Sequence, residues 1–174
     1  MMTDEYEGAW ITTYTGKRFH FLDPQPEEID IIDIAHHLSL LCRFTGACRE
    51  FYSVAEHSIR VADILPRELK LAGLLHDAAE SYTNDISRPV KYSHKLEETE
   101  ALISVAIGKK FNVELSHPKI KEADNIMIAT EAKDLMDNMD RWAELPEPLE
   151  SKIEPFISAK YVEHLFLLRF ESYL

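Results

Sequence analysis

Residues 71–85 read LAGLLHDAAESYTND, and this stretch decides the fold of the chain. The apolar run 71–75 belongs to a predicted helix that begins at Arg67 and breaks around Asn84-Asp85, because apolar residues recur there at helical steps. The polar pair His76-Asp77 follows that run, where the helix is otherwise burying itself. An unpartnered imidazole and carboxylate would be costly to desolvate at such a position. A bound cation is one of the few arrangements that satisfies both, so the stretch predicts a helix with a metal site.

Further ligands must come from other helices, because adjacent helical positions point about 100° apart. The stretch SVAEHS at 53–58 offers His57, and KEAD at 121–124 offers Asp124 just before an apolar segment. The predicted ligands are two neutral imidazoles and two carboxylates: His57, His76, Asp77 and Asp124. Imidazole ligands favour Zn, Co, Mn, Ni or Fe over Mg. The sequence therefore predicts one divalent transition metal of open identity.

The other segments predict helices behind one short β-hairpin. Aromatic and β-branched residues flank Thr15-Gly16, which predicts a hairpin over about 9–22. Apolar periodicity and capping residues predict the helices. They are expected from Asp33 as N-cap to about Thr45-Gly46, from Ser53 as N-cap to Pro66, and over about 93–111, 118–139 and 155–173, with a loop at 145–148.

Composition limits the class of protein. The chain has 174 residues, is 45% hydrophobic, and carries a formal net charge of −12, which favours one globular domain. That charge argues against a nucleic-acid polymer or an anionic membrane as partner. No apolar run reaches the roughly 20 residues of a membrane-spanning helix, and the acidic start lacks a signal-peptide pattern. Cys42 and Cys48 favour a reduced thiol pair. We therefore expect a cytoplasmic protein.

Five short stretches carry a family resemblance: RF at 43–44, SVAEHS at 53–58, HDAAE at 76–80 continuing to Asp85, RPVKY at 88–92, and KEAD at 121–124. With them the chain resembles the HD-domain metal-dependent phosphohydrolases, above all small bacterial 5′-deoxynucleotidases and phage-type HD nucleotide hydrolases. The resemblance implies an all-α, compact HD-domain helical bundle with a short N-terminal hairpin, forming one domain over 1–174. The motif-bearing core of this domain is expected over about 33–136. The protein would lie in the cytoplasm of a bacterium, or of the host cell if a phage encodes it.

The resemblance also implies roles for residues around the metal. Glu80 would help to activate water and Asp85 would also be catalytic, while Arg43 and Lys91 would contact the substrate. The residues themselves agree, because Glu80 comes one helical turn after His76, and fixed cations are needed around phosphate in an acidic protein.

Several side chains keep two interpretations at this stage. Phe44 could wall a nucleoside or pack in the core, and Lys121 could bind phosphate or be a solvated helix residue. Glu131 and Asp134 are interpreted as solvated acids or salt-bridge partners. The six histidines other than His57 and His76 are interpreted as surface or satisfied core residues.

The leading expectation is an enzyme that releases phosphate from 2′-deoxynucleoside 5′-monophosphates. A deoxynucleoside triphosphohydrolase, which releases triphosphate from substrates such as dATP, would use the same metal site. A hydrolase of signalling nucleotides and a catalytically inactive nucleotide-binding scaffold rank lower. The partner is expected to be a small deoxynucleotide, and a homodimer or higher homo-oligomer is compatible with the resemblance.

Overall fold

The computed structural model describes residues 9–94, 96–136, 145–156 and 158–174, and over these it is mostly helical. The predicted hairpin is confirmed: β1 (Trp10–Thr12) pairs antiparallel with β2 (Arg18–His20), with Ile11 opposite Phe19. Phe19 is fully buried and stacks on Tyr82 of α4 (Glu80–Thr83), with ring centroids 3.7 Å apart. The hairpin is thus fastened to the helical core by an aromatic contact.

Helix α1 (Ile31–Leu40) begins and ends earlier than the sequence predicted. Asp30 is its N-cap, accepting from the Ile32 amide. Asp33 is not the cap, because its buried carboxylate accepts from the backbone amide and hydroxyl of Thr15 at the hairpin turn, at 2.6 and 2.9 Å. The predicted continuation to 45–46 is also wrong, because the chain becomes extended at Leu41 and then pairs with residues Tyr52 and Ser53.

The predicted helix over 67–84 is broken in the middle. A 3-10 turn at Arg67–Leu69 leads into α3 (Lys70–Leu75), and α4 begins only at Glu80. Between them the amides of residues 78, 80, 81 and 82 bond three residues back, to the carbonyls of 75, 77, 78 and 79. This tighter winding lets the buried Ala78 and Ala79 approach the core.

The remaining helices follow the sequence signals with shifted ends. Helix α2 (Val54–Ile64) begins after Ser53, whose hydroxyl accepts from the Glu56 amide as predicted. The helix expected over 93–111 is preceded by a separate helix, α5 (Arg88–His94), which Pro89 in its first turn favours, and α6 spans Leu96–Phe111. Helix α7 (Pro118–Leu135) starts where predicted but ends earlier than expected, because the chain is extended at Met136; the expected end at Met139 itself lies outside the described residues. Helix α8 (Ala159–Tyr173) starts later than 155, at the N-cap Ser158, and 145–148 is a loop.

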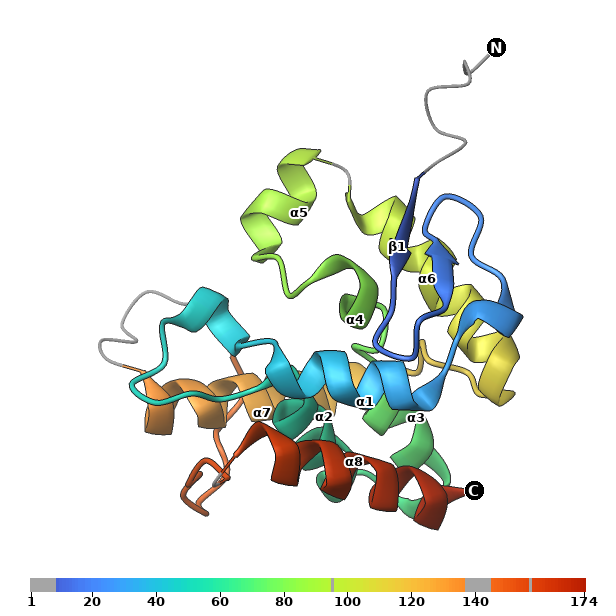
Figure 1. Ribbon diagram of the computed structural model, residues 1–174. Helices are drawn as coiled ribbons and strands as arrows, with labels where there is room; N and C mark the ends of the chain where they lie inside the picture. The colour runs from blue at the N-terminus through green and yellow to red at the C-terminus, as the bar shows by residue number, and fades with distance from the viewer. Residues whose placement is uncertain (1–8, 95, 137–144, 157) are drawn as a thin grey trace.

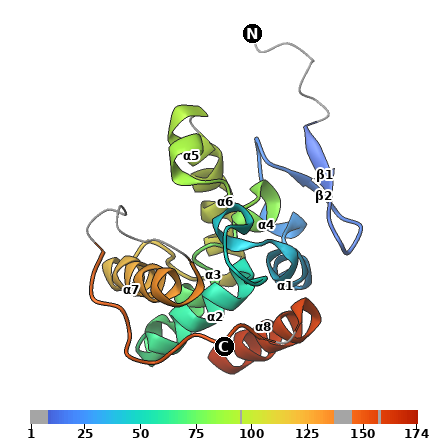
Figure 2. The same ribbon diagram turned by 90° about the vertical axis from the view of Figure 1, so that its left-hand side faces the viewer.

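The helices bury two neighbouring apolar clusters. Helix α1 packs on α8, and α2 packs on α3, α7 and α8, as Figures 1 and 2 show. The larger cluster joins α1, α2, α3, α4 and α8 to α6 and the hairpin, and the smaller one lies between α2, α3 and α7. Helix α5 stands at the opposite end of the molecule from α8 in both views. No described helix has the length and apolar character to cross a membrane.

Candidate metal centre

His57 faces α7 from the first turn of α2, and its side chain is fully buried. Its Nδ1 lies 2.6 Å from Oε1 of Glu131. Because the carboxylate is the acceptor, Nδ1 carries a hydrogen and Nε2 points elsewhere. That Nε2 has no hydrogen-bond partner, although it lies 3.3 Å from Oδ1 of Asp124 and 3.5 Å from Oδ2 of Asp77.

His76 sits at the end of α3, as its C-cap residue. Its Nδ1 lies 2.8 Å from the carbonyl oxygen of Gly73. A carbonyl can only accept, so Nδ1 donates and the lone pair of the neutral ring is on Nε2. This second Nε2 is also buried and without a hydrogen bond, and it lies 3.2 Å from Oδ2 of Asp77 and 4.0 Å from Oδ1 of Asp124.

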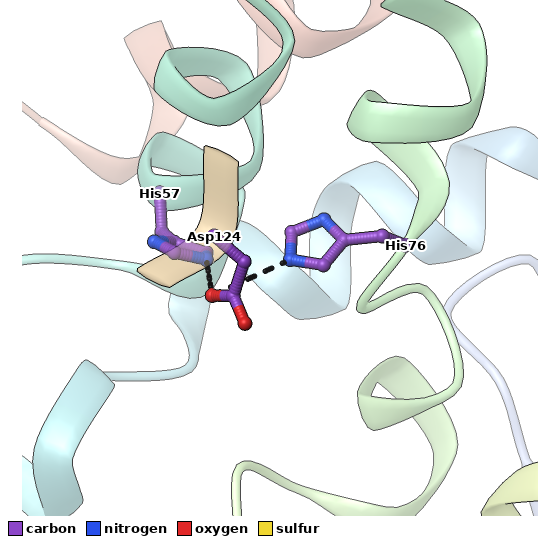
Figure 3. Close-up of side chains that lie close together, drawn as sticks. All are labelled: His57, His76 and Asp124. Carbon is purple, nitrogen blue, oxygen red and sulfur yellow. Dashed lines mark ion pairs between the residues drawn. The ribbon is translucent and has the colours of Figure 1, made fainter. Parts of the chain in front are cut away.

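Asp124, on α7, lies between the two imidazoles (Figure 3). His57, His76 and Asp124 each offer one ligand atom, and these atoms all lie within 4.8 Å of one another, so the group could hold a metal ion. Asp77 lies beside both rings but outside this mutual set of three. Two buried nitrogens without partners, facing carboxylates, fit a cation with imidazole and oxygen ligands.

The charges around this group favour a cation. Burial opposes ionisation of Asp77 and Asp124, yet the nearby histidines hold the pKa of both carboxyls well below its usual range. Burial and Arg43 disfavour a charged His57, but the carboxylates of Glu131 and Asp124 outweigh them and raise its pKa to about 9. In the metal-free protein His57 therefore holds a proton at neutral pH, and a divalent metal that binds there would displace this proton.

Arg43 lies beside the group, in the turn after α1. Its Nη1 is 3.5 Å from Oδ2 of Asp77 and its Nη2 is 3.3 Å from Oε2 of Glu131, while its buried Nε has no hydrogen bond. Its guanidinium lies over the ring of Phe44, 5.0 Å from the centroid. Phe44 and Thr45 are both left-handed, at φ 53° and 55°, which is strained for an aromatic and a β-branched residue. Arg43 directly precedes this strained pair, and the half-buried Phe44 is outside the two core clusters.

Glu80 forms an ion pair with Lys91 and is influenced by the charge of Asp85. Its Oε1 accepts from Lys91 Nζ at 2.8 Å, and the same Nζ lies 3.0 Å from Oε1 of Glu100. Burial, together with the charges of Asp77 and Asp85, raises the pKa of Glu80 to about 8. Asp85 is half-buried after Asn84, whose φ of 69° marks a sharp turn. The sequence placed Glu80 one turn after His76 on a single helix. Because α3 ends before His76 and α4 begins at Glu80, the two residues do not share a regular α-helix.

Lys121 and Glu131 lie on either side of Asp124 along α7, and they differ in burial: the first is exposed and the second is fully buried. Lys121 is an exposed helix residue whose Nζ lies 2.8 Å from Oδ2 of Asp124. Glu131 is not a solvated acid but the salt-bridge partner of the other interpretation, because its fully buried side chain pairs with His57 and Arg43. Sequence reasoning missed this contact. The available signal was its spacing of seven residues from Asp124, which places both on the same face of α7.

A cavity of about 440 Å³ opens beside His76 and Asp124. The loop before α7 and the first turns of that helix form its other walls. Its lining residues are His76, Asp77, Leu115, Ser116, His117, Pro118, Ile120, Lys121 and Asp124. The cavity thus joins apolar walls to the carboxylates and imidazole of the candidate metal centre.

Comparison with known proteins places the chain among bacterial relatives. No family model matches it. It is 38% identical over 138 residues to YfdR of Escherichia coli K12, covering 77% of each chain. It is 34% identical over 143 residues to RCAP_rcc00048 of Rhodobacter capsulatus, covering 73% of each. Both relatives bear the name "uncharacterized protein". At this identity and coverage, the chain belongs to the same protein family as YfdR and RCAP_rcc00048.

Proposed function

We propose that this protein is an HD-type metal-dependent phosphohydrolase that cleaves the 5′-phosphate ester of 2′-deoxynucleoside monophosphates, giving nucleoside and phosphate. The observation that carries the proposal is the pair of buried imidazoles whose partnerless Nε2 atoms face Asp77 and Asp124. His57, His76 and Asp124 would hold the metal, and Asp77 would complete the set. Such a metal, when bound, lowers the pKa of water and neutralises charge that develops on a phosphoryl oxygen.

The surrounding side chains supply proton transfer and charge. In its ionised form, the Glu80 carboxylate would accept a proton from the attacking water, and Lys91 would hold that carboxylate in place through its 2.8 Å contact. Arg43 would bind phosphoryl oxygens, for which its buried Nε has a hydrogen to donate. Asp85 would protonate the departing O5′ oxygen.

The cavity beside the ligands supports a nucleoside as the leaving group. Leu115, Pro118 and Ile120 offer apolar walls to a base or a sugar. The only cation of the lining, Lys121, is already paired with Asp124. Arg43 and Lys91, which also pair with carboxylates, lie outside this lining, so we assign the phosphate to these cations and the nucleoside to the cavity.

The test is phosphate release from a panel of mono-, di- and triphosphates of ribo- and deoxynucleosides, with Mn²⁺, Co²⁺, Zn²⁺, Ni²⁺ or Fe²⁺. We expect inorganic phosphate from deoxynucleoside monophosphates and none after chelation. Glu80→Gln should lower kcat by about 10²–10⁴-fold, whereas Glu98→Gln, at an exposed position on α6, should match the wild type. Inactivity on the whole panel with every metal would refute the proposal.

A triphosphohydrolase is the second candidate. The 47 residues from Asp77 to Asp124 form a short span, which favours the compact phage type in the resemblance described above. The same panel separates the two candidates, because chromatography of the product distinguishes triphosphate from phosphate.

A further inference from the structure

Glu131 is a buried carboxylate whose two oxygens are both engaged. Oε1 accepts from His57 Nδ1 at 2.6 Å and from the Tyr52 hydroxyl at 2.9 Å. Oε2 accepts from Arg43 Nη2 at 3.3 Å. A fully buried charge is tolerated only when it is paired and hydrogen-bonded, and these three donors meet that requirement. The carboxylate lies behind His57, on the ring edge away from Asp124.

That position controls which nitrogen of His57 is available. With its hydrogen on Nδ1, the ring has Nε2 free on the side of Asp124, 3.3 Å from Oδ1. Without an acceptor at Nδ1, the neutral ring could take the other tautomer or turn away. Carboxylates that hold a ligating histidine in this way typically change metal affinity by about 10–100-fold when they are mutated.

We propose that Glu131 is a positioning residue of the metal centre, which fixes the tautomer and orientation of His57 and thereby sets the affinity for a divalent metal. This inference rests on the metal site of the proposed function. The competing interpretation is that Glu131 serves only as a counter-charge for Arg43. The two differ in whether removal of the negative charge weakens metal binding.

The experiment titrates metal-free, full-length protein with Co²⁺, followed by calorimetry and by the visible absorption of the bound ion. Glu131→Gln has nearly the same shape, and we expect its Kd for Co²⁺ to rise by about 10–100-fold. Tyr52→Phe is the matched control, because it removes one hydrogen bond to the same oxygen without touching His57. Its Kd should change much less. Circular dichroism checks that both variants fold.

A second measurement covers the case in which Glu131→Gln does not fold. Nitrogen-15 NMR of wild-type protein with Zn²⁺ should show the hydrogen of His57 on Nδ1 and the metal on Nε2. Metal on Nδ1, or equal Co²⁺ affinity in Glu131→Gln and wild type, would overturn the positioning role and leave the metal site standing. A wild-type protein that binds neither ion would overturn both.

Discussion

Loss of the Glu80 proton should make the metal-free protein less stable as pH rises. Burial, Asp77 and Asp85 raise the pKa of this carboxyl from 4.5 to about 8 in the folded state. Between these values the folded state binds more protons than the unfolded state, so stability is fully present below about pH 4.5 and is lost as pH rises through 8. With these two pKa values, the contribution of Glu80 falls by about 3–4 kcal/mol between pH 5 and pH 8.

The perturbation is Glu80→Gln, which replaces the buried acid by a neutral group of the same shape. Relative to wild type, this variant should gain about 3–4 kcal/mol in the free energy of unfolding from pH 5 to pH 8. For a chain of this length, that corresponds to a relative shift in Tm of about 6–16 °C. Titrating groups that do not interact with Glu80 contribute equally to both proteins and cancel in the difference.

The assay is urea and thermal unfolding with a chelator present, at pH 5, 6, 7 and 8. Glu98→Gln is the control, because this acid is exposed on α6, and its curve should run parallel to wild type. Parallel pH curves for Glu80→Gln and wild type would refute the reasoning, since they would mean that the Lys91 contact keeps Glu80 ionised throughout.

Three further predictions concern the metal, the cavity and the core. Mn²⁺ or Co²⁺ at a hundred times Kd should raise the free energy of unfolding of wild type by about 2.7 kcal/mol. In thermal scans this corresponds to a rise in Tm of about 5–11 °C, which His76→Asn should abolish. Leu115→Trp, which fills the cavity beside the ligands, should raise KM for deoxynucleotides with unchanged Co²⁺ affinity; an unchanged KM would contradict the nucleoside assignment. Gly73→Ala should cost about 1–3 kcal/mol in urea unfolding, because the new Cβ overlaps Leu65 Cδ1 and lies 3.4 Å from Ala62 Cα; wild-type stability would show that Leu65 can move aside.

Local signals predicted much of the fold. The hairpin around Thr15-Gly16, the cap at Ser53 and the start of α7 at Pro118 are present as expected. Each depends on a few neighbouring residues and elementary backbone chemistry. The cap assigned to Asp33 failed because another acid, Asp30, lies one position before the helix start and the tertiary contact with Thr15 uses Asp33 instead.

The candidate site divides in the same way. Its side chains could be chosen from the sequence because polar residues within apolar helical segments are costly to bury without partners, and the structure brings His57, His76 and Asp124 together. The function of Glu131 could not be assigned, because its partners are Tyr52 and His57, both far from it in the sequence.

By itself, the sequence indicated which segments form helices and turns and which side chains could ligate a metal, because these properties depend on side-chain type and local spacing. Only the tertiary structure decided that α3 and α4 are separate, that Asp33 secures the hairpin turn, and that Glu131 lies behind His57. The physical reason is that burial and long-range pairing set the free energy of a polar group, and its neighbours in space are settled only when the helices pack.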